Sequence, residues 1–444
     1  MGGGMVMEVD VAIVGGGMAG LALAVALQER GIQAHVFEKA PAKRKHFGTG
    51  MSIGQNGIRA LEGIKPGLSE KMESLGQRTR QFTTTIRQPG EPEIKISPSS
   101  QLVASERMFT ITWKSACDSL LDSLIDSDKV HRRHTLIDYK PVEDGVEALF
   151  EVQVDEASGL STAETKVTAK LLVGADGVWS RVRELMVGDE PRNLNLVTWL
   201  GIVPTDIARS MQLHQDDEIS FISYPSKRTG IITCHCGSGQ SLWHFRIPDE
   251  SGELMKSFTS DFHDHGQEAR KMRVLKRIEA MKELQNMKTV IERTESSVIR
   301  EDRNFDRLPL SSWSDPSGHV VLLGDAAHGM YPGPGMGARV AFEDAHQLAL
   351  LLHEAFSSPT PATAVPAAIK RYEHLRIPRC TALQGFAAEL TTWPAMIPEL
   401  LQSLSPEQKA QRVEEFFRWI NKYPAAMAGD PDSSFWKPEQ VTGM

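Results

Sequence analysis

Short apolar runs along the chain alternate with segments of helical periodicity. Residues 11–37 contain an apolar run, three consecutive glycines, a helical stretch and a second apolar run. Apolar runs of about four to eight residues bounded by glycines are typical of buried strands. Residues 319–356 also contain an apolar run, followed by the pair Gly324-Asp325 and a long helical stretch. Both regions therefore predict α/β structure.

Two other segments have the alternation of strands. Residues 81–96 contain a threonine-rich strand, a turn and a return strand, and residues 193–248 place Trp199 and Trp243 among β-branched and small residues. We expect these segments to form one mainly β domain inserted into the α/β domain. The predicted boundaries are 8–80, 101–190 and 300–385 for the α/β domain, 81–100 and 191–299 for the inserted sheet domain, and 386–444 for a helical C-terminal segment.

The C-terminal segment contains a helix start at Ser405-Pro-Glu-Gln408, which has the spacing of a capping box with proline at the first helical position. Val413, Phe416 and Ile420 give this helix one apolar face. We expect that face to pack either on the main body or on a second copy of the chain in a homodimer. The sequence leaves both open.

Length and composition narrow the class of protein. A chain of 444 residues exceeds a single ordinary core, and 41% hydrophobic with 24% charged residues is ordinary for a soluble globular protein. The net charge of −8 argues against nucleic acid as a partner, and no apolar run reaches the roughly 18 residues of a membrane span. Because no signal peptide is visible and the four cysteines are scattered, we expect a reducing, cytoplasmic location.

The glycines after the first apolar run have the pattern of a dinucleotide-binding turn. Gly15 makes the tight turn, Gly17 lets the backbone approach a pyrophosphate, and Gly20 lets the helix pack close to the strand. Glu38 follows at close to the spacing of about 20 residues expected for an acid that binds a ribose hydroxyl. This motif alone leaves FAD and NAD both open. The residues that it assigns to the dinucleotide are Gly15, Gly17, Met18, Ala19, Gly20, Glu38 and Lys39.

Four downstream motifs resemble those of single-component FAD-dependent aromatic hydroxylases. Residues 174–183 resemble that family's Asp-Gly motif, and residues 324–338 resemble its Gly-Asp motif. Glu343-Asp344-Ala345 and residues 372–379 match the rest of the pattern in the same order. The resemblance covers roughly residues 8–385 and extends to salicylate hydroxylase, urate hydroxylase and zeaxanthin epoxidase. It implies an FAD cofactor and an α/β fold, a Rossmann-like FAD-binding domain with an inserted, mainly β substrate domain and a helical C-terminal tail.

The resemblance also implies roles for residues near the cofactor. Asp325, beside Gly324 at the end of a strand, would accept a hydrogen bond from a ribityl hydroxyl, and Asp176 would support FAD. Arg181 or Arg183 would meet phosphate. The arginine with which many relatives reach the pyrophosphate has no counterpart here, and Arg107 is the nearest substitute.

The loop from residue 332 to residue 338 would contact the flavin ring. By resemblance, Pro332 lies over the flavin near the oxygen site. The small residues that follow let the backbone approach the isoalloxazine, and they precede a helix whose N–H groups stabilise negative charge on reduced flavin. The flavin-binding residues assigned to this loop are Gly335, Met336, Gly337 and Ala338.

The resemblance implies a monooxygenase that uses NADH or NADPH and O2 to hydroxylate or epoxidise a small, electron-rich, aromatic substrate through a flavin C4a-hydroperoxide. The substrate pocket is expected between the inserted sheet and the flavin. Strand alternation places His244 and Arg246 on one face, opposite Trp243 and Phe245, and leaves open which face lines the pocket. The catalytic candidates are Pro332, Tyr224, His235, His244 and Arg246.

A metal site is not expected. Neighbouring residues of Cys234-His235-Cys236 point to opposite faces of a strand, and no second ligand pair has zinc-site spacing. Two other functions stay open. A flavin-dependent reductase or dehydrogenase would keep the same FAD motifs, and a non-catalytic protein could use the fold as a binding module. The intact glycines at 335 and 337 disfavour the binding module, because a site without flavin has no need of close backbone approach.

Overall fold

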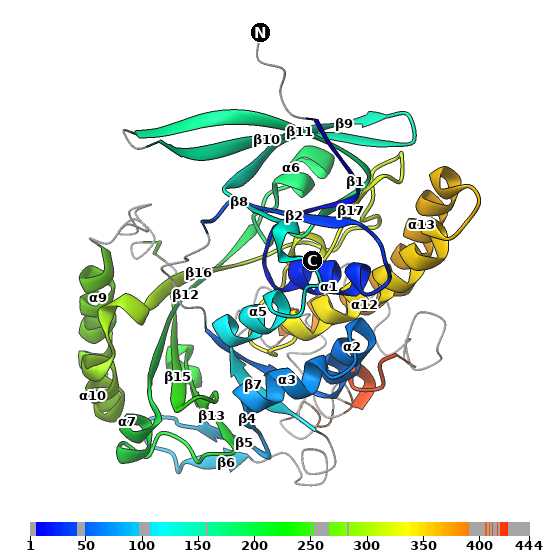
Figure 1. Ribbon diagram of the computed structural model, residues 1–444. Helices are drawn as coiled ribbons and strands as arrows, with labels where there is room; N and C mark the ends of the chain where they lie inside the picture. Colours follow the sequence, from blue (N-terminus) through cyan, green and yellow to red (C-terminus); the bar gives the residue numbers. More distant parts are fainter. Residues whose placement is uncertain are drawn as a thin grey trace.

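The computed structural model describes residues 6–41, 49–96, 107–156, 159–249, 251–252, 266–281 and 284–389, together with residues 405, 408, 411, 415 and 418–424 of the C-terminal segment. Figure 1 shows one sheet at the top, a layer of helices below it, and a second sheet at the lower left.

The first sheet has a parallel centre extended by an antiparallel hairpin. Its order is β8-β2-β1-β11-β10-β9, and β17 also pairs with β11. The first four of these strands and β17 run parallel, whereas β10 and β9 are antiparallel. The strands are β1 (Val6–Val14), β2 (Ala34–Glu38), β8 (Val130–Arg132), β9 (His134–Val142), β10 (Gly145–Glu156), β11 (Gly159–Gly174) and β17 (Val320–Leu322).

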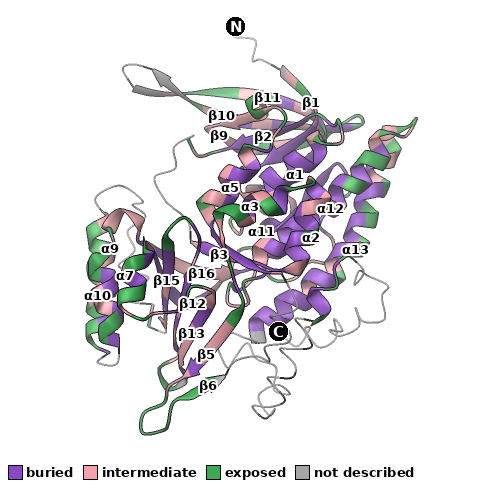
Figure 2. Cartoon of the chain, turned by 60° about the horizontal axis from the view of Figure 1, so that its bottom comes forward, coloured by how far each residue is buried: buried purple, intermediate pink, exposed green. Residues whose placement is uncertain are grey.

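Helices pack beside this sheet and share its hydrophobic core. They are α1 (Met18–Gln28), α2 (Gln55–Ile64), α3 (Leu68–Leu75), α5 (Trp113–Leu121), α6 (Arg181–Val187), α11 (Asp325–His328), α12 (Gly337–Phe356) and α13 (Pro361–Glu389). Figure 2 shows α1 and α12 largely buried at the centre of the molecule. A small antiparallel sheet lies nearby, with β3 (Gly50–Ile53), β7 (Phe109–Thr112) and β4 (Gln77–Arg78) in that order.

The second sheet carries its own hydrophobic core. Its order is β16-β12-β15-β14-β13-β5-β6, and each pair is antiparallel except β13 with β5. The strands are β5 (Gln81–Ile86), β6 (Ile94–Ile96), β12 (Arg192–Pro204), β13 (Glu218–Tyr224), β14 (Thr229–His235), β15 (Gln240–Pro248) and β16 (Arg300–Asp306). Helices α7 (Thr205–Ser210), α9 (Gln267–Glu279) and α10 (Gln285–Arg293) pack on one face of it (Figure 1). Short 3-10 turns occupy Ser127–Lys129, Pro225–Lys227 and Ser296–Val298.

The α/β class and the separate, mainly β sheet predicted from the sequence are confirmed. The second sheet extends past the predicted boundary at residue 299, because β16 pairs with β12.

In the C-terminal segment, the N–H of Ser405 donates to Oε1 of Gln408 at 2.9 Å and the N–H of Gln408 donates to Oγ of Ser405 at 3.2 Å. These bonds confirm the capping box. Most of residues 390–444, including Val413 and Phe416, lies outside the described residues.

Candidate cofactor and substrate site

The glycine turn between β1 and α1 is held by close packing at two of its glycines. Gly15 has a φ of +107°, and a Cβ there would overlap the carbonyl oxygen of Ala175. A Cβ at Gly20 would overlap the carbonyl oxygen of Gly15. Gly17 differs, because a Cβ there would meet no atom within 4 Å. Gly15 and Gly20 are therefore required by the fold, whereas the space beside Gly17 is open for a ligand.

The start of α1 has the features of an anion site. Gly17 is its N-cap and supplies no side-chain hydrogen bond, and the first turn contains no acidic residue. The N–H groups of that turn and the helix dipole therefore face outward with partial positive charge. Glu38 is buried, and its carboxylate accepts hydrogen bonds from the N–H of Gly16 at 2.6 Å and of Ala40 at 2.8 Å. Glu38 thus braces the turn, and Lys39 beside it is exposed.

The Gly-Asp turn after β17 lies against the glycine turn. Gly324 has a φ of +63°, and a Cβ there would be 2.9 Å from Cβ of Ala19. Asp325 begins α11 and is exposed, although the residues on both sides of it are buried. A Cβ at Gly337 would be 3.6 Å from Oδ1 of Asp325, so the carboxylate lies beside the first turn of α12. Two motifs far apart in the sequence therefore meet, as a dinucleotide held at both ends requires.

The loop before α12 is held by an arginine that the motif analysis missed. Gly335 has a φ of +66° and is exposed together with Pro332, whereas Met336 is buried. Arg339 is buried and donates from Nε to the carbonyl of Ser52 at 2.9 Å and from a terminal nitrogen to Oγ of Ser52 at 2.7 Å. An arginine among the small and apolar residues of the first two turns of α12 is the signal that could have identified it.

A buried ion network lies behind the Gly-Asp turn. Oδ2 of Asp344 accepts hydrogen bonds from the N–H of Gly324 at 3.1 Å and from Nε2 of His328 at 2.6 Å, and Oδ1 accepts from Nε of Arg376 at 2.8 Å. Arg379 donates to both oxygens of Glu343, at 2.7 and 2.9 Å. Burial opposes a charged imidazole, but contacts with Cys380 and Asp344 raise the pKa of His328 well above its usual value.

The same network contains a set of metal-ligating atoms. His328, Asp344 and Cys380 place one such atom each within 4.8 Å of one another. Arg376 contacts both Asp344, at 2.8 Å, and Sγ of Cys380, at 3.7 Å. Because the guanidinium already neutralises this carboxylate, the arrangement is that of an ion network rather than of a metal centre. Cys234 on β14 and Cys236 just after it are, by contrast, buried thiols.

The Asp-Gly motif supports the scaffold in the structure. Asp176 accepts hydrogen bonds from Oγ of Ser180 at 2.5 Å and from the N–H of Arg181 at 2.6 Å, at the start of α6. Arg183 is fully buried and donates to the carbonyl of Ala327 at 2.9 Å, which ties α6 to α11. Burial removes Arg183 from any phosphate at the surface. Arg107 donates from Nε to Glu73 at 2.6 Å.

Four of the catalytic candidates come from the second sheet. Two of them, His244 and Arg246, lie together on the face of that sheet that meets the α/β part. Nε2 of His244 is hydrogen-bonded to Oγ1 of Thr49, and the guanidinium of Arg246 lies 5.0 Å from the ring centroid of Tyr331. Burial, together with the charges of Arg300 and Arg246, lowers the pKa of His244 to about 3. Trp243 and Phe245 lie on the opposite face, in the core under α9 and α10. The face of the second sheet that meets the α/β part is thus the face of His244 and Arg246.

The other two candidates lie on the face with Trp243 and Phe245. Tyr224 is buried in that core, and its hydroxyl accepts a hydrogen bond from Arg87 at 3.2 Å. His235 is the cross-strand partner of Ser241, and the pair of Thr233 with Trp243 lies two residues further along the same strands. Side chains two residues apart on a strand share a face, so His235 lies on the face of Trp243. The structure therefore separates Tyr224 and His235 from His244 and Arg246.

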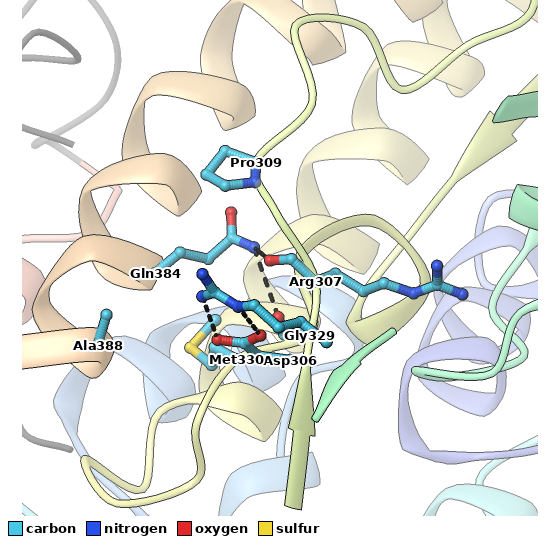
Figure 3. Close-up of a pocket in the computed structure, with 8 residues that line it drawn as sticks. Asp306, Arg307, Pro309, Gly329, Met330, Gln384 and Ala388 are labelled. Carbon is cyan, nitrogen blue, oxygen red and sulfur yellow. Dashed lines mark hydrogen bonds and ion pairs between the residues drawn. The ribbon is translucent and has the colours of Figure 1, made fainter. Parts of the chain in front are cut away.

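A pocket lies where β16, α13 and the loop after α11 meet (Figure 3). Its polar groups are paired with one another. Arg192 donates to Asp306 at 2.8 and 2.9 Å, and Nε2 of Gln384 donates to the carbonyl of Arg307 at 2.8 Å. The residues that line it are Arg192, Asp306, Arg307, Pro309, Gly329, Met330, Gln384 and Ala388.

Within the described part of the chain, no helix is long and apolar enough to cross a membrane.

Comparisons with known proteins agree with this geometry. The chain is 28% identical to 3-amino-4-hydroxybenzoate 2-monooxygenase of Streptomyces cremeus, over 97% of this chain and 98% of that protein. It is 28% identical to a chloroplastic zeaxanthin epoxidase of an Oncidium hybrid cultivar, over 85% of this chain but only 54% of the epoxidase. The fold is similar to that of HpxO of Klebsiella pneumoniae, solved with FAD and uric acid, with a TM-score of 0.69, 22% identity and coverage of 94% of this chain and 96% of HpxO. The family model described as FAD binding domain matches residues 8–387, and the chain belongs to that family of FAD-binding oxidoreductases.

Proposed function

We propose that the protein is an FAD-dependent monooxygenase that uses NADH or NADPH and O2 to hydroxylate or epoxidise a small, electron-rich, aromatic substrate. One observation carries the proposal. The uncapped start of α1, Asp325 and the start of α12 lie against one another, and Thr49 and Tyr331 join this junction to the second sheet. The similarity to a hydroxybenzoate monooxygenase over almost the whole of both chains supports it.

The residues at the junction fit FAD. The open space beside Gly17 and the outward N–H groups of α1 suit the pyrophosphate, and the exposed carboxylate of Asp325 suits a ribityl hydroxyl. The start of α12 supplies partial positive charge toward the flavin. When bound, FAD supplies the redox chemistry that activates O2. The residues proposed to hold it are Gly15, Gly17, Met18, Ala19, Gly20, Glu38, Asp176, Gly324, Asp325, Gly335, Met336, Gly337 and Ala338, with Lys39 and Arg107 at the edge.

The second sheet would bind the substrate and exclude water from the flavin. His244, with its lowered pKa, is neutral near pH 7 and fixed by Thr49, so it can offer one hydrogen bond without adding charge. Arg246 lies next to it, over Tyr331. Pro332, which follows Tyr331 and is exposed, is proposed to border the reacting position.

The test begins with purified protein, which should be yellow and should oxidise NAD(P)H faster when an aromatic substrate is added. Under 18O2, the product should carry one labelled oxygen. Product without label would show a reductase or dehydrogenase instead. A colourless protein that cannot be reconstituted with FAD would remove the proposal altogether.

A further inference from the structure

A short piece of the C-terminal segment, residues 418–424, packs into the main body of the chain. Trp419, Ile420 and Tyr423 are buried there and belong to the same hydrophobic core as the first sheet and its helices. Ile420, one of the apolar residues predicted to need a packing partner, thus finds it within its own chain. Residues 418–424 are called the docked segment below.

Two helices hold the docked segment by directed hydrogen bonds. Arg59 on α2 donates to the carbonyl of Asn421 at 2.6 Å and to that of Tyr423 at 3.0 Å. On α12, Gln347 donates to the hydroxyl of Tyr423 at 3.0 Å, and Nδ1 of His346 lies 2.7 Å from the same oxygen. Because burial lowers the pKa of His346 to about 4, its ring is neutral near pH 7 and can accept the hydroxyl proton. The segment is therefore bound by specific polar contacts as well as by apolar burial.

Arg379 on α13 joins the docked segment to the buried ion network. Its Nη2 donates to the carbonyl of Ile420 at 2.7 Å and to Oε1 of Glu343 at 2.9 Å, so one nitrogen serves both. The guanidinium carbon lies 4.8 Å from the ring centroid of Trp419 and 5.7 Å from that of Tyr423. The two rings therefore exclude water from the pair of Arg379 with Glu343, and a charge pair is stronger in such dry surroundings.

The network continues from Glu343 to the Gly-Asp turn. Nη1 of Arg376 lies 2.8 Å from Oε2 of Glu343, and Nε of the same guanidinium donates to Oδ1 of Asp344 at 2.8 Å. Asp344 in turn accepts a hydrogen bond from the N–H of Gly324 at 3.1 Å. A continuous chain of buried ion pairs and hydrogen bonds therefore runs from the docked segment to the turn that is proposed to hold FAD.

We propose that docking of residues 418–424 and binding of FAD are coupled, so that the docked segment retains the cofactor and is itself released when FAD is lost. This inference rests on the part of the proposed function that assigns Gly324 and Asp325 to FAD. While the segment is docked, the dry network holds Gly324 in the conformation that FAD requires. A coupling between two binding events is reciprocal, so FAD stabilises the docked segment by the same factor by which the segment stabilises FAD.

The first experiment measures backbone hydrogen exchange of residues 418–424 in wild-type protein, with FAD bound and after its removal, without NAD(P)H or substrate. Exchange in the docked segment should slow at least about 10-fold when FAD binds. Because a ligand stabilises the folded chain as a whole, this slowing must exceed that of α9 and α10, which pack on the second sheet. An equal change in all three elements, or no change in the docked segment, overturns the inference.

The second experiment weakens the docked segment at a residue outside the network. Arg59→Met removes an exposed side chain that donates to two carbonyls of the segment. It should speed exchange at residues 418–424 and raise the Kd of FAD, titrated into apoprotein, about 5- to 10-fold. The control Arg371→Met removes an exposed arginine of α13 that pairs with Glu354, and it should leave the Kd within about 2-fold of wild type. Faster exchange in Arg59→Met with an unchanged Kd overturns the inference.

Failure of the inference and failure of the proposed function give different results. Neither experiment uses oxygen chemistry or a substrate, so product without label under 18O2 would remove the monooxygenase and leave the coupling. Protein that binds FAD with the same exchange at residues 418–424 in both forms would remove only the coupling. Protein that binds no FAD would remove both. The wild-type exchange comparison decides the matter even if Arg59→Met fails to fold.

Discussion

The buried charges on the two sides of the candidate site are arranged in opposite ways. Behind the Gly-Asp turn, Asp344 is bound by His328 and Arg376, and Glu343 by Arg379, so each charge has its partner inside the chain. On the second sheet, Arg246 has none among the described residues. Since both regions are desolvated, the difference separates charges that are compensated inside the chain from a charge that has no such partner among the described residues.

The pKa values of the two histidines in these regions are shifted in opposite directions, because one has an acidic partner and the other has cationic neighbours. Although burial opposes it, the contacts with Cys380 and Asp344 raise the pKa of His328, so its ion pair stabilises the fold below about pH 6.5 and is lost as the pH rises through the raised pKa. Burial and the nearby arginines lower the pKa of His244 to about 3. Its surroundings favour the neutral form, and acid therefore destabilises the folded state.

The largest effect is expected from breaking the ion network. Asp344→Ala leaves His328 and Arg376 buried without their shared carboxylate and frees the N–H of Gly324. Removing one partner of a buried pair costs about 3–5 kcal/mol, so urea unfolding should show a loss of this size together with weaker FAD retention.

The matched control for that variant lies on the same two helices. Glu354→Ala breaks the pair between Glu354 on α12 and Arg371 on α13, whose side chains are both 61% exposed. Its effect should stay within about 0.5 kcal/mol. If Asp344→Ala were as mild as Glu354→Ala, the network would not be holding the Gly-Asp turn.

A second prediction tests the substrate side through the pH dependence of stability. Between a pKa of about 3 when folded and 6.5 when unfolded, only the unfolded chain protonates His244, so stability falls as the pH decreases from 6.5. His244→Gln should remove this contribution and reduce the loss between pH 6.5 and 5 by about 2 kcal/mol. Urea unfolding at both pH values measures it. The exposed His353 offers the control His353→Gln, which should leave the slope as in wild type.

A third prediction separates a glycine required by the fold from one required by the cofactor. Gly17→Ala places a methyl group where no atom lies within 4 Å, on a backbone with a φ of −81° that alanine readily adopts. The apoprotein should therefore keep its stability, while the dissociation constant of FAD rises at least about 10-fold because the backbone can no longer approach the pyrophosphate. Gly20→Ala, which overlaps the carbonyl of Gly15, should lose stability and FAD together. Equal FAD affinity in Gly17→Ala and wild type would place the pyrophosphate elsewhere.

The sequence predicted the geometry of the glycine turn better than the faces of the second sheet, and the reason is physical. Gly15, Gly20 and Glu38 act over short stretches of chain, where strand, turn and helix follow one another and spacing reports geometry. The face presented by His244 depends on which side of the sheet the helices cover, which is set by packing between distant segments. Whether an arginine has a partner depends on cross-strand register, so no local pattern distinguishes Arg246 from the buried, structural Arg183.

The smallest effect is expected from Tyr224, and it tests the division between the two faces of the second sheet. Tyr224→Phe removes a hydroxyl that accepts one hydrogen bond from Arg87, which also pairs with Glu93. Because the ring still fills the core under the helices, stability should fall by only about 1 kcal/mol. Because this core lies on the face opposite His244 and Arg246, substrate-dependent NAD(P)H oxidation should stay within about 2-fold of wild type. A large loss of turnover with intact FAD binding would mean that the substrate reaches both faces of the sheet, and the contrast between a structural face and a binding face would fail.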